Sequence, residues 1–187
     1  MRWMRSGIFE EIINIARTHY TTHHEQSIWY AIDSSLKKAP FIQDGGKNPT
    51  DRAKNGIKQV IVVDRKGTAL AALVAPANVH DSKLLTAFIE QIADNNGKVL
   101  ILAADSAFDV KKLRKLCAMR NIALITPTNP RRAKNTHSVK VAHRWVIERT
   151  FGWISWCRGL KTCWAKSRQS HLAFLNFYLA VRLFTSS

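Results

Sequence analysis

Val99-Leu-Ile-Leu-Ala-Ala104 is a short, wholly apolar run of sequence that ends at an acidic residue, Asp105. A run of this length and composition predicts a strand that is buried on both faces of a sheet. In open α/β sheets, functional side chains gather beyond the carboxyl ends of the strands. We therefore expect a sheet covered by helices, with a functional carboxylate at Asp105.

Upstream of this run, three more strands are expected, and the first of them also ends at an acidic residue. Ser27 to Asp33 (SIWYAID) is rich in aromatic and β-branched residues, which predicts a strand ending at Asp33. Lys58 to Val63 (KQVIVV) and Ala69 to Val74 (ALAALV) follow, and the connection Asp64-Arg-Lys-Gly67 suits a hairpin. The first part of the sheet is therefore expected to be antiparallel.

Helices are expected on either side of these strands and between the later ones. They cover Met1–His19, Asp81–Ile92 (with Asp81 as the N-cap), Val110–Met119, Val139–Trp156 and Ser170–Phe184, with a strand at Ile122–Ile125 and loops at Thr21–Gln26 and Pro127–Thr136. Antiparallel strands followed by alternating helix and strand predict an α/β fold whose mixed sheet has helices on both faces. This is the ribonuclease-H-like arrangement.

The positive charge of the chain is concentrated in its second part. The formal net charge is +16, yet residues 1–109 are nearly balanced, whereas residues 110–187 hold 16 Lys and Arg against one acid, Glu148. Such a surface attracts polyanions, so a nucleic acid is the expected partner, although a ribosomal-type basic protein would have a similar charge. A lone carboxylate in this basic field repels phosphate unless a cation lies between them, which makes Glu148 a candidate metal ligand.

Composition excludes several classes of protein. The chain of 187 residues is 46% hydrophobic and 22% charged, which is typical of a globular domain with a real core. No apolar run is long enough for a membrane span, and the basic start lacks the apolar stretch of a signal peptide. Three cysteines without a CxxC pair argue against a zinc site or disulfide framework. The unpaired cysteines fit a reducing cytoplasm, and we expect no membrane contact.

Three acids from distant parts of the sequence are candidates for one catalytic site. Asp33 and Asp105 follow strands, and Glu148 lies on a partly apolar helical stripe, where a carboxylate is costly unless it is paired or binds metal. Two metal ions held by carboxylates can activate an attacking oxygen and neutralise a leaving oxygen in phosphoryl transfer. Mg²⁺ prefers oxygen ligands, and we expect two such ions, with Mn²⁺ as the alternative.

Five segments of the chain resemble, in order, the successive signatures of insertion-sequence DDE transposases, most closely the insertion-sequence-five type. They are AIDSS (Ala31–Ser35), GKNPTDRAKNG (Gly46–Gly56), ANVHDSKLL (Ala77–Leu85), AADSAFD (Ala103–Asp109) and HRWVIERTFGW (His143–Trp153). The similarity runs from about Trp3 to Leu183. It implies that Asp33, Asp105 and Glu148 are the three metal-binding acids and that Arg144 contacts DNA phosphate.

The resemblance also implies a reaction, a domain division and partners. Hydrolysis would free a 3′-hydroxyl at an element end, and this hydroxyl would then attack target DNA. Residues 1–26 would be the helical remnant of an end-recognition region, and residues 27–187 the catalytic domain. The expected partners are element ends, target DNA, further copies of the chain and an upstream frame product. The expected location is the prokaryotic cytoplasm, in association with the nucleoid. The chain departs from the family at Ser106-Ala-Phe108, and at Val141 and Ser155, where related groups have Tyr and Lys.

Seven further cations are expected to contact phosphates without reading sequence, namely Lys47, Arg52, Lys54, Lys58, Arg131, Arg132 and Lys134. Two other functions are compatible with the same residues. One is an inactive DNA-binding remnant of a transposase, and the other is a metal-dependent DNA nuclease without strand transfer. Asp81 is expected to be a helix cap and is not counted as catalytic.

Overall fold

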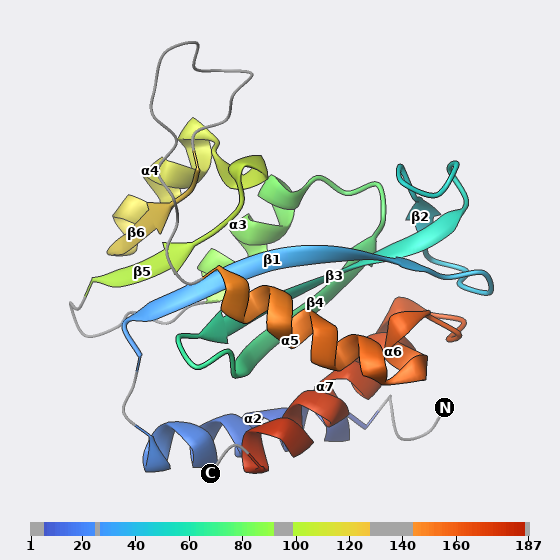
Figure 1. Ribbon diagram of the computed structural model, residues 1–187, viewed down its shortest axis with the longest axis horizontal. Helices are drawn as coiled ribbons and strands as arrows, with labels where there is room; N and C mark the ends of the chain where they lie inside the picture. The colour runs from blue at the N-terminus through green and yellow to red at the C-terminus, as the bar shows by residue number, and fades with distance from the viewer. Residues whose placement is uncertain (1–5, 25–26, 92–98, 128–143, 186–187) are drawn as a thin grey trace.

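The computed structural model describes residues 6–24, 27–91, 99–127 and 144–185. Its centre is a six-stranded mixed sheet in the order β2-β3-β1-β5-β6, with β4 paired to β3 along the same edge as β2 (Figure 1). The strands are β1 (Trp29–Lys38), β2 (Gly46–Lys47), β3 (Asn55–Asp64), β4 (Ala69–Pro76), β5 (Leu100–Ala103) and β6 (Ile122–Ile125). The strands β1 to β4 pair antiparallel, whereas β1, β5 and β6 pair parallel.

Helices cover both faces of the sheet, as the order of elements in the sequence predicts. They are α2 (Ile8–His23), α3 (Asp81–Gln91), α4 (Lys111–Met119), α5 (Trp145–Trp156), the short α6 (Arg158–Lys161) and α7 (Arg168–Phe184), with a 3₁₀ turn at Ser106–Phe108. Figure 1 shows α3 and α4 on one face, and α5 and α7 on the other, with α2 lying along α7.

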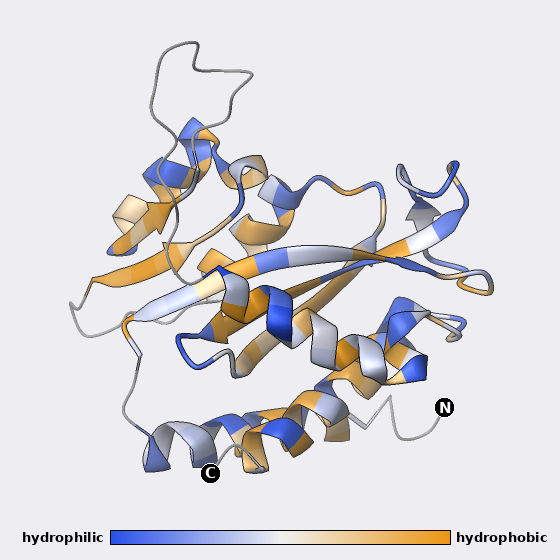
Figure 2. Cartoon of the chain, in the orientation of Figure 1, coloured by the Kyte–Doolittle hydropathy of each residue, from blue (hydrophilic) through white to orange (hydrophobic). Residues whose placement is uncertain are grey.

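The sheet separates two hydrophobic cores because successive side chains of a strand point to opposite faces. On β1, Ala31 belongs to the core beneath α5 and α7, whereas Ile32 belongs to the core beneath α3 and α4. The strand β5 is hydrophobic along its whole length, as Figure 2 shows. This is the pattern of a strand covered by helices on both faces, and it explains why the apolar run before Asp105 becomes a strand.

The strand β1 is longer than the sequence predicts, because it continues past Asp33 to Lys38. Its parallel pairing with β5 ends at Ala31 opposite Ala103, but its antiparallel pairing with β3 continues to Lys38 opposite Gly56. Asp33 therefore lies where one edge of β1 becomes unpaired while the other edge is still held. The strand does not end there; only its parallel neighbour does.

The helix α2 begins at Ile8 and ends at His23 instead of His19, so its last turn takes in the start of the segment expected to be a polar loop. Tyr20 lies directly before that segment and is buried, and its hydroxyl donates a hydrogen bond of 2.7 Å to Asp64 Oδ2. This tertiary contact keeps the last turn of the helix on the core, which the local run of polar residues does not indicate.

The hairpin between β3 and β4 holds α5 in place. The Thr150 hydroxyl donates to the Gly67 carbonyl oxygen over 2.6 Å, and Arg149 donates to the Lys66 carbonyl oxygen over 2.6 Å. Gly67 has φ +85°, a left-handed conformation that glycine adopts without strain, and a Cβ there would lie 2.9 Å from the Arg149 side chain. The position of α5 is thus set by a close approach to this turn.

Candidate catalytic site

Asp33 and Asp105 lie side by side at the carboxyl ends of the parallel-paired segments of β1 and β5. Each carboxylate accepts a hydrogen bond from the backbone N–H of the next residue, at 2.8 Å from Ser34 and 2.6 Å from Ser106. The bond from Ser106 also caps the 3₁₀ turn that begins there. Because both contacts are to adjacent backbone atoms, the two carboxylates are held by the chain next to them.

Arg144 joins the two aspartates. One guanidinium nitrogen lies 3.5 Å from Asp33 Oδ2, and another lies 3.5 Å from Asp105 Oδ1. Arg144 immediately precedes α5, and its side chain is 24% exposed, so the guanidinium reaches the sheet edge from the end of that helix. The residue predicted to contact phosphate and two of the three predicted acids therefore come together in the structure.

Burial raises the pKa of the Asp33 carboxyl above its ordinary value. The hydrogen bond from the Ser34 N–H and the positive charge of Arg144 oppose this rise, whereas the negative charges of Asp105 and Asp81 add to it. The fold thus disfavours the ionised form of Asp33. A further cation between these acids would stabilise the ionised form.

Glu148 lies in the first turn of α5, four residues after Arg144, and its side chain is exposed. The structure shows no hydrogen bond or ion pair between Glu148 and the two aspartates. Within the described ranges, no group of three or more His, Cys, Asp or Glu side chains is arranged to hold a metal ion. Asp33 and Asp105 are brought together, and Glu148 stands on the adjoining helix with its carboxylate in solvent.

Lys58 and Asp81 have side-chain partners that the sequence does not predict. Lys58 is buried, and its ammonium lies 2.9 Å from Asp81 Oδ1 and donates to the Val79 carbonyl oxygen over 2.7 Å. The ammonium of Lys58 is therefore less accessible than those of the exposed lysines, and its contact with DNA phosphate stays a prediction. Asp81 begins α3, but its Oδ1 accepts from the hydroxyl of Ser34 on β1 over 2.9 Å, so it bonds to the sheet and is not the predicted N-cap.

A signal for this pair is present in the sequence. Lys58 begins a run, KQVIVV, that is otherwise apolar apart from its neighbour Gln59, and a charge at the start of such a strand needs a partner when the strand is buried. The identity of that partner depends on how α3 packs on the sheet, which local patterns do not show.

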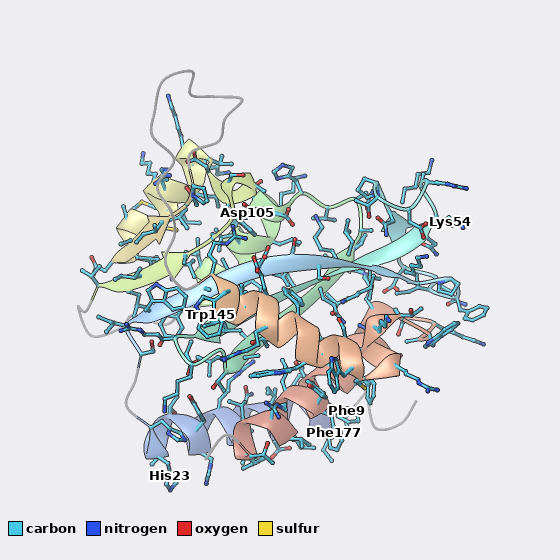
Figure 3. The ribbon with its side chains drawn as sticks, in the orientation of Figure 1. Phe9, His23, Lys54, Asp105, Trp145 and Phe177 are labelled. Carbon is cyan, nitrogen blue, oxygen red and sulfur yellow. The ribbon has the colours of Figure 1, made fainter. Side chains whose placement is uncertain are left out.

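The remaining predicted cations fall into two groups. Lys47, Arg52 and Lys54 are exposed around the turn that joins β2 to β3. Figure 3 shows Lys54 at the far end of the β1–β3 ribbon from Asp105. Arg131, Arg132 and Lys134 lie outside the described residues. No described helix is both long enough and apolar enough to cross a membrane.

The donor set at this sheet edge fits a hard divalent cation. Mg²⁺ is usually bound by one or two carboxylates, with waters and substrate phosphates as the other ligands. Asp33 and Asp105 supply two carboxylates close enough to share one guanidinium. Two carboxylates that share a cation in this way form a site in which a metal ion could replace the arginine.

Comparisons with known proteins agree with this architecture. The chain resembles the catalytic domain of Mos1 mariner transposase, with a TM-score of 0.50, 11% identity, and coverage of 96% of this chain and 82% of that one. It also resembles a piggyBac transposase from a synaptic complex with hairpin DNA, with a TM-score of 0.50, 11% identity, and coverage of 88% and 47%. At this identity the likeness concerns the fold alone, and it supports the predicted ribonuclease-H-like arrangement.

Sequence comparison is more specific. Over 137 residues the chain is 34% identical to the transposase assigned to insertion sequence element IS402 of Burkholderia cepacia. The matched part is 70% of this chain, which spans only 64% of that relative's length. The family model described as the transposase DDE domain matches residues 17–183, which include Asp33, Asp105, Arg144 and Glu148. The resemblance inferred from the five sequence segments is confirmed, and the chain belongs to the transposase DDE domain family.

Proposed function

We propose that this chain is the catalytic core of an insertion-element transposase, which cleaves DNA at an element end and joins that end to target DNA. The observation that carries the proposal is the convergence of Asp33, Asp105 and Arg144 at one sheet edge, although β1, β5 and α5 are far apart in the sequence. Membership in the DDE family supports it. The surplus of Lys and Arg after residue 109 supports a DNA substrate.

Each residue of the site has a proposed role. Asp33 and Asp105 would hold divalent metal ions, Mg²⁺ or Mn²⁺, and Glu148 would complete the ligand set from α5. When bound, the metal would activate the attacking oxygen and neutralise charge on the scissile phosphate. Arg144 would leave the two aspartates and contact a non-bridging phosphate oxygen, where its planar guanidinium makes paired hydrogen bonds.

The proposed reaction consists of two displacements at phosphorus. In the first, a water molecule loses a proton as its oxygen bonds to phosphorus. The bond from phosphorus to the 3′-oxygen breaks, and that oxygen takes up a proton and leaves as the 3′-hydroxyl of the element end. In the second, this hydroxyl loses its proton and attacks a target phosphodiester, which releases a target 3′-hydroxyl. Neither displacement needs a nucleophile from the protein, in keeping with a site built from acids and one arginine.

Arg144 is predicted to compete with the metal in the absence of DNA. Arg144→Ala should therefore raise the affinity of the chain for Mn²⁺, because the carboxylates lose the cation that now neutralises them. The same change should lower the slope of log K against log salt for duplex DNA by about 0.9, which corresponds to one lost phosphate contact. Arg144→Lys is the matched control. It should keep the salt slope but bind Mn²⁺ more tightly than the wild type, since one ammonium cannot bridge both carboxylates as the guanidinium does.

The function is tested with labelled duplexes that carry the DNA flanking the gene, incubated with Mg²⁺ and a supercoiled target plasmid. Cleavage that leaves a 3′-hydroxyl, followed by joined product, is the expected result, and EDTA should abolish both. Cleavage without joining, even when a 3′-hydroxyl end is supplied ready-made, would indicate a simple nuclease. A gel shift without cleavage would indicate an inactive DNA-binding remnant.

A further inference from the structure

A buried network lies on the opposite face of β1 from Arg144 and connects three elements. Lys58 on β3 is 8% exposed, and its ammonium is shared between Asp81 Oδ1 at 2.9 Å and the Val79 carbonyl oxygen at 2.7 Å. The Asp81 side chain is 20% exposed. A buried ion pair of this kind is costly to desolvate, so stabilisation alone is a weak reason for its presence.

Ser34 connects this network to the candidate catalytic site. Its hydroxyl donates to Asp81 Oδ1 over 2.9 Å, while its backbone N–H donates to Asp33 Oδ1 over 2.8 Å. Asp33 and Ser34 are consecutive on β1, so their side chains point to opposite faces of the sheet. A restraint on the Ser34 side chain therefore restrains the peptide unit whose N–H orients the Asp33 carboxylate.

Anchoring of α3 does not by itself explain the direction of the Asp81 carboxylate. The start of α3 already has another side-chain cap, because the Ser82 N–H donates to His80 Nδ1 over 3.2 Å. The Asp81 carboxylate instead bonds to side chains of β1 and β3. It acts on the part of β1 that has no β5 partner, where pairing with only one neighbour leaves the backbone less constrained.

We propose that Asp81 is a positioning residue of the catalytic site, which acts through the Ser34 hydroxyl to hold the Asp33 carboxylate in its metal-binding orientation. The ammonium of Lys58, 2.9 Å from Asp81 Oδ1, fixes the position of the Asp81 carboxylate. Removal of a residue that orients a metal ligand through a hydrogen bond commonly lowers metal affinity by about 10- to 100-fold. This inference rests on the proposed function, because it presupposes that Asp33 binds metal.

The test is a titration of the whole chain with Mn²⁺ in the absence of DNA. The electron paramagnetic resonance signal of free Mn²⁺ measures how much of the metal is bound. Ser34→Ala and Asp81→Asn should each weaken Mn²⁺ binding by about 10- to 100-fold. Ser34→Thr keeps a hydroxyl and should restore most of the affinity. Asp44→Asn is the charge-matched control, since Asp44 pairs with Arg168 away from the site, and it should bind Mn²⁺ as the wild type does. A thermal unfolding curve of each variant checks that it is folded.

The outcomes separate this inference from the function on which it rests. If Asp33→Asn abolishes Mn²⁺ binding but Ser34→Ala and Asp81→Asn bind normally, Asp81 only anchors α3 and the inference fails alone. A loss in Ser34→Thr as large as in Ser34→Ala would also overturn it, because packing and not the hydroxyl would then matter. If Asp33→Asn binds Mn²⁺ as the wild type does, the proposed metal site itself is refuted. Should Asp81→Asn not fold, Ser34→Ala decides, because it leaves the Lys58 ion pair intact.

Discussion

Asp33→Asn is expected to reduce Mg²⁺-dependent DNA cleavage by at least about 10³-fold. A metal ion stabilises the transition state of phosphoryl transfer by several kcal/mol, and each 1.36 kcal/mol corresponds to about a tenfold change in rate. Asn keeps the shape of the side chain but removes the charge that holds the cation. The measurement is the initial rate of cleavage of the element-end duplex, with Asp105→Asn expected to behave alike and Asp44→Asn expected to match the wild type.

The same variant should be at least as stable as the wild type at pH 7. Burial raises the pKa of Asp33 in the folded state, so the ionised carboxylate destabilises the fold at neutral pH. This cost is absent below the ordinary Asp pKa of about 3.9 and fully present above the raised folded value. The unfolding midpoint of Asp33→Asn should therefore equal or exceed that of the wild type at pH 7, and the difference should shrink as the pH falls towards 4.

Activity and stability thus change in opposite directions, which distinguishes a catalytic acid from a structural one. A structural aspartate would lose stability together with activity. If Asp33→Asn cleaves DNA at the wild-type rate, the site is wrongly assigned. If its unfolding midpoint at pH 7 drops clearly below that of the wild type, the carboxylate is a net stabilising group and the account of its burial is wrong. Asp44→Asn controls for the loss of one negative charge.

Ile147→Ala is expected to cause the largest loss of stability near the site. Ile147 is 0% exposed and lies on α5 between Arg144 and Glu148, in the core shared with Ala31 and Ile61. Truncation of a buried Ile to Ala costs about 2–5 kcal/mol, because it removes apolar contacts and leaves a cavity. In a domain of this size the unfolding midpoint should fall by roughly 4–20 °C. Differential scanning calorimetry measures it directly.

The matched control lies on the same helix. Gly152 is exposed, and a Cβ added there meets no atom within 4 Å. Gly152→Ala should stabilise the chain by about 0.5–1 kcal/mol, since alanine favours a helix interior over glycine. If Ile147→Ala lowers the free energy of unfolding by less than about 1 kcal/mol, α5 is not packed on the sheet as described. Arg144 would then lack a fixed support.

Much of the architecture could be predicted from local sequence patterns. The apolar run before Asp105 becomes β5, the segment Ile122–Ile125 becomes β6 with the predicted bounds, and Asp64-Arg-Lys-Gly67 forms the hairpin. The predicted end of β1 at Asp33 was wrong because a strand continues for as long as either neighbour pairs with it. Pairing with β3 continues beyond the point where pairing with β5 stops. The predicted end of α2 at His19 was wrong because buried Tyr20, through its hydrogen bond to Asp64, holds one more turn of helix on the core.

The sequence alone determined which side chains stand near the carboxyl ends of strands, because apolar runs and the acids that follow them are local features. It therefore identified Asp33 and Asp105, and its motifs identified the family. Only the tertiary structure decided the partners of the charged groups. Arg144 bridges two acids, and Lys58 pairs with Asp81, because α5 and α3 approach the same sheet edge from opposite faces. Such pairings depend on distances between elements that are far apart in the chain, and no local pattern encodes them.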